Sequence, residues 1–286
     1  MKINDRVHQL RVQFNITPEI TRYVYVYIIT GKEGCYLVDA GVKGCDKKIE
    51  EYIHKIGNSR QTINALILTH SHPDHIGAAR SIKEGYDSCI YACQGEKDWI
   101  EDTGLQYKER PIPGYYSLVD GSVTVDRILS DGDLLCLEPG ITIQVIGVPG
   151  HSRESLCFYY REQKILFTGD SIPEPSDALI YEDSHASEET LKRLELLEEV
   201  DMYCPAWDKV YDRRTGIAMI HEGLSRISKL RRCTEGYRGR MGEESTHRLF
   251  ELICEESNMA EYKKNPLFMR SVMSDLSRLN QGNLRD

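Results

Sequence analysis

Apolar residues in the first part of the chain fall into spacings typical of strands and of helices in turn. Residues 23–29 (YVYVYII) and 35–38 (CYLV) are rich in β-branched and aromatic side chains, and the glycine-bounded segment 31–34 (GKEG) separates them. This arrangement predicts a β-hairpin. The apolar positions of residues 49–56 then recur at helical spacing and stop at Gly57, which predicts an amphipathic helix.

Three predicted strands lead directly into a histidine or an aspartate. Residues 65–68 (ALIL) are predicted to form a short buried strand and residues 141–148 a longer one. A hairpin is predicted from residues 156–160 and 165–168. The residues that follow these strands are Thr69-His70, Pro149-Gly150-His151 and Gly169-Asp170. Polar residues in loops that leave buried strands are candidates for a functional site.

After residue 170 the chain is predicted to be mostly helical, with one last short strand over residues 202–204. Ser187, followed by two glutamates, is a predicted helix N-cap. A long helix is predicted around residues 217–227, and from about residue 240 the pattern is helical only, with Pro266 at a helix start. We therefore expect a layered α/β domain over residues 1–239 and a small helical C-terminal extension over residues 240–286.

The composition is that of an ordinary globular protein. Acidic residues outnumber basic ones by 45 to 36, and the formal net charge is -9, so the overall field does not attract a nucleic-acid backbone. No stretch approaches the roughly 18 apolar residues of a membrane helix, and the first residues lack the apolar core of a secretory signal. We expect a cytoplasmic protein that acts on a small molecule, with neither a membrane nor a nucleic acid as its partner. The oligomeric state is left open.

The cysteines are expected to be reduced thiols. There are nine of them, and no Cys-x-x-Cys pair occurs, so neither disulfides nor a thiolate zinc site are expected. Cys93, which follows a predicted strand, is expected to be a small buried residue. His54 and His221 on predicted helices, and His185 in a predicted loop, are expected to lie outside the site.

The segment 70–75 (HSHPDH) places three imidazoles and a carboxylate within six residues. A loop that leaves a strand can point alternate residues the same way, so His70 and His72 can share one metal ion. Asp74 and His75 can reach a second ion close by. Imidazole nitrogen combined with carboxylate oxygen is the ligand set of catalytic rather than structural metal sites. The alternative, a histidine-rich surface turn, offers no packing reason for this density of ligands.

This segment, placed after an apolar strand, resembles the His-x-His-x-Asp-His signature of the metallo-β-lactamase superfamily. That superfamily includes glyoxalase II-like thioesterases, lactonases and phosphodiesterases. Further segments resemble family motifs in the right order: residues 36–41 (YLVDAG), 149–152 (PGHS) and 167–171 (FTGDS). The resemblance implies an αββα sandwich, with the site at one edge between two sheets.

The resemblance also implies two divalent metal ions, zinc first and manganese or iron as alternatives. The ligands implied are His70, His72 and His151 for the first ion, Asp74 and His75 for the second, and Asp170 as the bridge. The ions would share a water, lower its pKa and present hydroxide to the substrate. Asp74 would orient that hydroxide and relay its proton. Asp39 would hold a ligand loop in place, the alternative being a turn-forming aspartate after a strand.

One departure from the family pattern concerns the last motif. The family usually ends its last strand with Pro-Gly-His-Gly, whereas residues 204–208 read CPAWD here, so Trp207 takes the place of the histidine. Asp208 is one alternative oxygen ligand. Without it the second ion keeps Asp74, His75 and Asp170, and its site is expected to be weak or empty.

The function expected is therefore that of a metal-dependent hydrolase acting on an ester-like substrate: a thioester, a lactone or a similar acyl compound. The segment 107–116 (YKERPIPGYY) and Trp207 offer aromatic surface that suits an organic acyl group. Because the helical tail is similar to that of ribonuclease-like family members, a phosphodiesterase or endoribonuclease is the first alternative. A degenerate ligand-binding protein with a residual metal site is the second.

Overall fold

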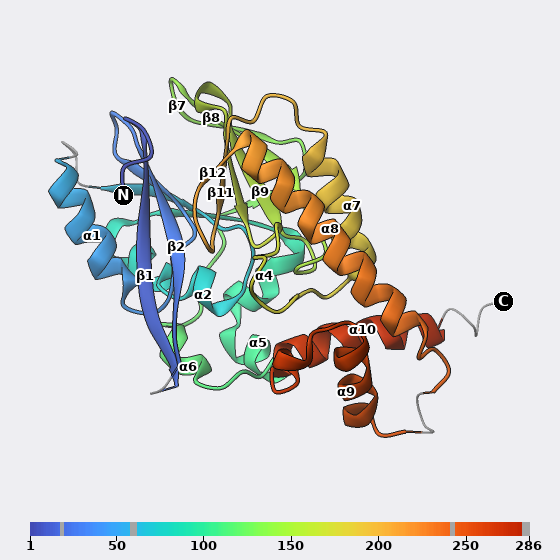
Figure 1. Ribbon diagram of the computed structural model, residues 1–286. Coiled ribbons are helices and arrows are strands. Elements are labelled where there is room, and N and C mark those ends of the chain that lie inside the picture. Colours follow the sequence, from blue (N-terminus) through green and yellow to red (C-terminus); the bar gives the residue numbers. More distant parts are fainter. Residues whose placement is uncertain (18–19, 58–61, 241–243, 282–286) are drawn as a thin grey trace. The chain divides into compact units, whose positions relative to one another are not determined.

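The computed structural model describes residues 1–17, 20–57, 62–240 and 244–281 (Figure 1). The chain divides into two compact units. Unit 1 comprises Met1–Gly147, Glu154–Gly169 and Tyr203–Val210, and unit 2 comprises Val148–Arg153, Asp170–Met202 and Tyr211–Asp286. The boundary expected between residues 239 and 240 stays a prediction.

One sheet of unit 1 begins with the long N-terminal hairpin. Its order is β1-β2-β3-β4-β5-β6. The pairs from β1 to β3 are antiparallel and those from β3 to β6 are parallel. The predicted hairpin is confirmed by the antiparallel pairing of Tyr27 with Val38. The bounds are β1 (Val7–Thr17), β2 (Ile20–Thr30), β3 (Cys35–Val38), β4 (Ile63–Ile67), β5 (Cys89–Cys93) and β6 (Arg127–Leu129).

The second sheet of unit 1 faces the first. Within the unit its order is β11-β10-β9-β8-β7, and the hairpin predicted from residues 156–160 and 165–168 is confirmed. The ring of Tyr27 on β2 lies 5.2 Å from the ring of Phe167 on β10, and its hydroxyl donates to the carbonyl of Pro205 at 2.6 Å. The bounds are β7 (Leu134–Glu138), β8 (Ile141–Gly147), β9 (Leu156–Tyr160), β10 (Ile165–Gly169) and β11 (Met202–Pro205), with a 3-10 turn η1 (Arg161–Gln163) after β9.

Helices cover the other face of the first sheet. Val24, Val26 and Ile28 alternate along β2 and join a buried core to which α1 contributes Ile49 and Ile53. Alternation along a strand and three-to-four spacing along a helix bring these faces together. The bounds are α1 (Cys45–Ile56), α2 (Pro73–Ile76), α3 (Ala79–Tyr86), α4 (Gln94–Glu101), α5 (Thr103–Glu109) and α6 (Tyr115–Leu118).

Side chains cap the helix starts of unit 2. The carboxylate of Asp183 accepts the N–H of Ala186 at 3.0 Å, so the prediction that Ser187 is the N-cap is wrong. Ser187 lies one turn inside the helix, where its hydroxyl donates to the Asp183 carbonyl. The last helix begins at Pro266, as predicted, because proline fits the first helical position. The bounds are α7 (Ser184–Glu195), β12 (Tyr211–Asp212), α8 (Arg213–Glu235), α9 (Thr246–Glu256), η2 (Ala260–Tyr262) and α10 (Pro266–Gln281).

The C-terminal helices have their own packing within unit 2. α10 contacts α8 and α9, and the rings of Phe250 on α9 and Phe268 on α10 lie 5.6 Å apart, edge to face. Both side chains are fully buried. Figure 1 shows these two helices in red. No helix in the described ranges is both long enough and apolar enough to cross a bilayer.

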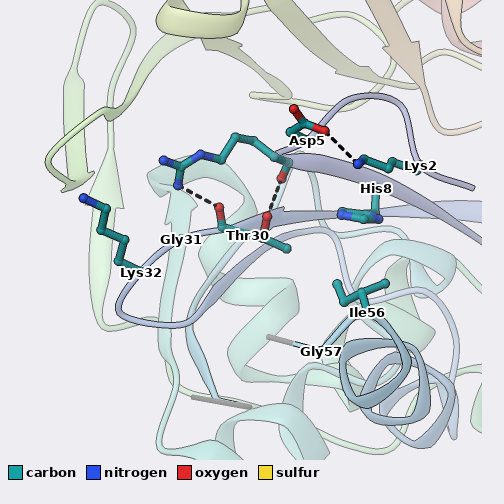
Figure 2. A pocket seen from close by; sticks show the side chains of 9 residues that line it. Lys2, Asp5, His8, Thr30, Gly31, Lys32, Ile56 and Gly57 are labelled. Atoms are coloured by element: carbon teal, nitrogen blue, oxygen red, sulfur yellow. Dashed lines mark hydrogen bonds and ion pairs between the residues drawn. The ribbon is translucent and has the colours of Figure 1, made fainter. Parts of the chain in front are cut away.

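A hollow of about 410 Å³ opens beside the N-terminal segment of unit 1 (Figure 2). Lys2 and Arg6 lie on its wall, but Lys2 pairs with Asp5 at 2.7 Å and Arg6 donates to the carbonyl of Thr30 at 3.2 Å. Burial lowers the pKa of His8 on the same wall. The residues that line the hollow include none of the predicted metal ligands.

Candidate metal centre

The histidine-rich segment of unit 1 begins at the buried end of β4. The loop after β4 leads to His72, which is the N-cap residue of α2, and Pro73 follows as the first helical residue. Proline suits this first helical position, because its fixed φ angle is preorganised for the helix. Asp74 and His75 lie on this short helix rather than in a loop.

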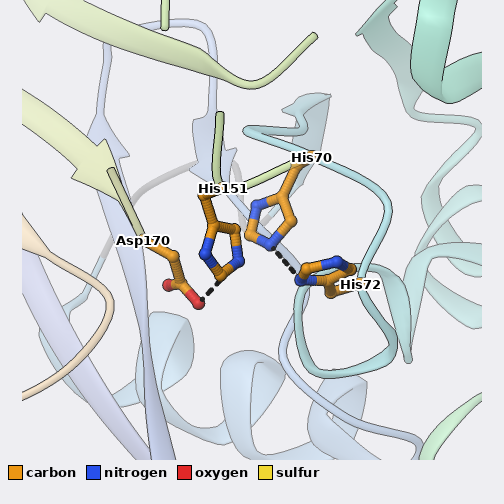
Figure 3. Close-up of side chains that lie close together, drawn as sticks. All are labelled: His70, His72, His151 and Asp170. Carbon is orange, nitrogen blue, oxygen red and sulfur yellow. Dashed lines mark hydrogen bonds and ion pairs between the residues drawn. The ribbon is translucent and has the colours of Figure 1, made fainter. Parts of the chain in front are cut away.

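The imidazoles of this segment are close together and buried. His70, His72 and His75 are 1%, 4% and 0% exposed. Nε2 of His70 lies 2.9 Å from Nδ1 of His72 (Figure 3), and the ring centroids of His70 and His75 lie 4.0 Å apart. The structure thus brings together the three histidines that the sequence predicted to act as a group.

Asp39 binds the histidine-rich segment at two points, Thr69 and His75. It follows β3, has a φ of 62° and is 2% exposed. One of its oxygens accepts the N–H of Thr69 at 2.8 Å, and the other lies 2.8 Å from Nδ1 of His75. A carboxylate can only accept here, so Nδ1 of His75 carries a proton, and in the neutral imidazole Nε2 carries the lone pair.

Glu96 is a second buried anchor, and no signal in the sequence singles it out. It lies in the first turn of α4 and is 2% exposed. Its Oε2 accepts both the N–H of Ser71 at 3.1 Å and the Ser71 hydroxyl, and its Oε1 accepts the N–H of Glu154 at 3.1 Å. Gln106 on α5 donates to the carbonyl of Ser71. The residue between His70 and His72 is therefore held on both sides of its backbone.

Unit 2 carries the other two predicted ligands of the first ion. Nδ1 of His151 donates to the carbonyl of Ile180 at 2.9 Å, and in the neutral imidazole this leaves the lone pair on Nε2. That Nε2 lies 3.4 Å from Oδ2 of Asp170 (Figure 3). Gly150, with a φ of 130°, must be glycine, because a Cβ there would lie 2.4 Å from the backbone nitrogen of Ser187.

Within unit 1, Leu156 at the start of β9 and Gly169 at the end of β10 lie beside Thr69. The N–H of Leu156 donates to the carbonyl of Thr69 at 2.8 Å. A Cβ at Gly169, whose φ is 50°, would lie 2.8 Å from Oγ1 of Thr69. The residue next to His70 therefore has the ends of β9 and β10 as its neighbours.

Trp207 and Asp208 lie in unit 1, after β11. The guanidinium of Arg22 stands 4.9 Å above the Trp207 ring, and the ring of Tyr23 lies 5.9 Å from it. The Asp208 N–H donates to the Tyr23 hydroxyl at 3.0 Å, and the φ of Asp208 is 63°. Their predicted place beside the second metal ion stays a prediction.

The other histidines considered in the sequence, and Cys93, have surroundings that the structure describes. His54 and His221 have half-exposed side chains in ion pairs with Glu50 and Glu195. His185 is exposed, although it lies on α7 and not in the predicted loop. Cys93 is buried, as expected, and burial raises the pKa of its thiol.

The family model described as the metallo-beta-lactamase superfamily matches residues 20–206. A probable metallo-hydrolase of Bacillus subtilis is 31% identical over 147 residues, which are 50% of this chain and 64% of the relative. A hydroxyacylglutathione hydrolase of Pelagibacter ubique is 24% identical over 63% of this chain and 65% of its own length. An acyl-coenzyme A thioesterase of Gallus gallus is 28% identical over 62% of this chain and 67% of its own. The chain thus spans about two thirds of each of these relatives.

A solved structure supports the fold over nearly the whole chain. A metallo-beta-lactamase family protein from Thermus thermophilus superimposes with a TM-score of 0.75, covering 99% of this chain and 95% of that one, at 16% identity. At this identity the likeness concerns the fold alone, and it confirms the predicted α/β class with two sheets flanked by helices. The family model, which matches more than half of the chain, shows that this chain belongs to the metallo-β-lactamase superfamily.

Proposed function

We propose that this chain is a metal-dependent hydrolase of an ester-like acyl substrate. The observation that carries the proposal is the facing pair of nitrogens, Nε2 of His70 and Nδ1 of His72, 2.9 Å apart in a buried loop. Two imidazole nitrogens on one tetrahedral zinc ion, each at about 2.0–2.1 Å from it, stand roughly 3.3 Å apart. The pair is therefore spaced much as two ligands of one ion would be.

The first ion would be held by His70, His72 and His151, with Asp170 as the bridge to a second ion, as the family motifs imply. The donor set fits a divalent metal, because it combines neutral imidazoles with a carboxylate and has no thiolate. The hydrogen bond from Nδ1 of His151 to Ile180 leaves Nε2 as the donor atom. Zinc suits this set best, with manganese and iron as alternatives.

A second ion would be held by Asp74 and His75, with Asp170 as the bridge. Asp39 supports this role by fixing the tautomer that presents Nε2 of His75 as the donor. The missing histidine of the last motif leaves this ion the weaker of the two unless Asp208 supplies an oxygen. Divalent ions supply Lewis acidity, polarising a substrate oxygen and acidifying water. Asp74 would then accept a proton on its carboxylate.

Two exposed aromatic rings, the net charge and the named relatives favour a small acyl substrate over a polyanion. The relatives named hydroxyacylglutathione hydrolase and acyl-coenzyme A thioesterase favour a small acyl compound. In unit 1 the rings of Tyr107 and Tyr116 lie 5.1 Å apart, and both side chains are exposed. Such aromatic surface suits an acyl group better than a phosphate backbone. The net charge of -9 also opposes polyanion binding, and cytoplasmic residence stays an expectation.

Metal analysis of the purified chain, combined with a hydrolysis panel, tests the proposal. The panel holds thioester, lactone, phosphodiester and β-lactam substrates. We expect bound divalent metal and acyl hydrolysis that depends little on ionic strength. Salt-sensitive cleavage of single-stranded RNA without acyl hydrolysis would favour the endoribonuclease. Bound metal with no hydrolysis of any substrate would favour a ligand-binding protein.

A further inference from the structure

The last helix, α10, carries four polar side chains on one face. Ser271, Ser274, Asp275 and Arg278 follow each other at intervals of three, one and three residues along α10. This spacing places all four side chains on the same side of a helix. Ser271 and Asp275 are 1% and 5% exposed, so this face is buried at its centre rather than solvated.

All four side chains contact one short segment, residues 181–184, which leads into α7. The Tyr181 N–H donates to the Ser271 hydroxyl at 2.9 Å, and the Tyr181 hydroxyl donates to Asp275 at 2.9 Å. The Ser274 hydroxyl donates to the carbonyl of Glu182 at 2.8 Å. Arg278 donates to the same carbonyl at 3.0 Å and to the carboxylate of Asp183.

The pair at the centre of this contact, Tyr181 and Asp275, is buried. Tyr181 is 4% exposed, and burial raises the pKa of its phenol and that of the Asp275 carboxyl. Asp275 also accepts the Ser184 N–H at 3.4 Å. A buried polar group that loses its hydrogen-bond partner destabilises the fold. These hydrogen bonds therefore fix the position of the segment against α10.

The same segment holds the loop that carries His151. The Glu182 and Asp183 N–H groups both donate to the carbonyl of Gly150, at 2.8 and 3.1 Å. The carbonyl of Ile180, the residue before the segment, accepts a hydrogen bond from Nδ1 of His151 at 2.9 Å. The carbonyl of Gly150 and the imidazole of His151 therefore both bind residues 180–183. Helix α10 holds these residues through its own hydrogen bonds.

We infer that α10 is a positioning element for His151: through Ser271 and Asp275 it holds residues 180–183, which set the orientation and tautomer of that imidazole. The inference rests on the proposed function only in taking His151 as a metal ligand. Partners that orient a ligating histidine typically change metal affinity about 10- to 100-fold when removed. The helical tail thereby has a role at the site without contributing a ligand.

Asp275→Ala in the full-length chain tests the inference. We expect zinc affinity, measured by chelator competition, to fall about tenfold or more. NMR of the metal-free, ¹⁵N-histidine-labelled protein should show that the Nδ1 protonation of His151 is lost or mixed. Asp275→Asn keeps an acceptor for the Tyr181 hydroxyl. It should therefore restore most of the zinc affinity and most of the Nδ1 protonation of His151.

Ile253→Ala is the matched control, because Ile253 is buried in α9 and outside the polar face. It should lower the melting temperature while leaving zinc affinity and the His151 spectrum unchanged. If Asp275→Ala does not fold, Tyr181→Phe, which keeps the ring, carries the same expectation. Wild-type zinc affinity and an unchanged His151 tautomer in a folded variant would overturn the inference. Absence of metal from the wild type would instead remove the proposed function, while the NMR result would still decide the role of α10.

Discussion

The carboxylate of Glu96 accepts the backbone N–H of Ser71 at 3.1 Å, and with it the hydroxyl of the same residue. A side chain 25 positions further along the chain thus fixes the one residue that separates His70 from His72. Its other oxygen accepts the Glu154 N–H. The spacing of the two imidazoles is therefore imposed by tertiary contacts as well as by the sequence of the loop.

Replacing Glu96 with glutamine should weaken both the fold and the metal site. The amide keeps the shape but puts a donor where the carboxylate has an acceptor, so a buried N–H or hydroxyl loses its partner. We expect a loss of about 1–3 kcal/mol in the free energy of unfolding and about tenfold in zinc affinity. Denaturant titration and chelator competition measure the two. Asp98→Asn, exposed on the same helix, is the control, and an equal effect there would contradict the prediction.

His72→Ala should remove bound metal and hydrolysis together. The imidazole is buried beside His70, and alanine removes both of its ring nitrogens. Metal content by mass spectrometry and the acyl hydrolysis rate are measured on the same preparation. His54→Ala, at an exposed position on α1, should leave both unchanged. Full metal content and activity in His72→Ala would refute the ligand assignment.

The second metal ion should bind more weakly than the first. On our proposal Trp207 stands where the family has the histidine that completes this site, so we expect one tight ion and one that dialysis removes. Metal titration by calorimetry resolves the two affinities. Two equally tight ions, with one weakened in Asp208→Ala, would show instead that Asp208 supplies the missing ligand.

Thiol alkylation of the native protein should leave the metal in place. Burial raises the pKa of Cys35 and of Cys45 to about 12, so both stay protonated and unreactive at neutral pH. The exposed Cys136 should react first. Metal content is compared before and after iodoacetamide treatment, with urea-unfolded protein as the control for full labelling. Stoichiometric release of metal from the folded protein would indicate a thiolate ligand.

The sequence by itself determined the features that depend on neighbours along the chain. The β-branched and aromatic composition of residues 23–29 and 35–38 and the helical spacing before Gly57 are local, and so is the density of ligands in residues 70–75. The α10 start at Pro266 is local too, because proline acts through its own φ angle. The predicted α/β class follows from the order of such elements and is confirmed.

Only the tertiary structure decided which distant groups hold the site. Glu96 and Ser71 are 25 positions apart, and Asp275 and Tyr181 are 94; no spacing rule links them. Ser187 has the composition of an N-cap, yet Asp183 caps α7 because its backbone leaves the helix where its side chain can accept an N–H. A lone acidic residue carries no distinguishing signal in a sequence. Its role depends on which donors the fold brings within about 3 Å.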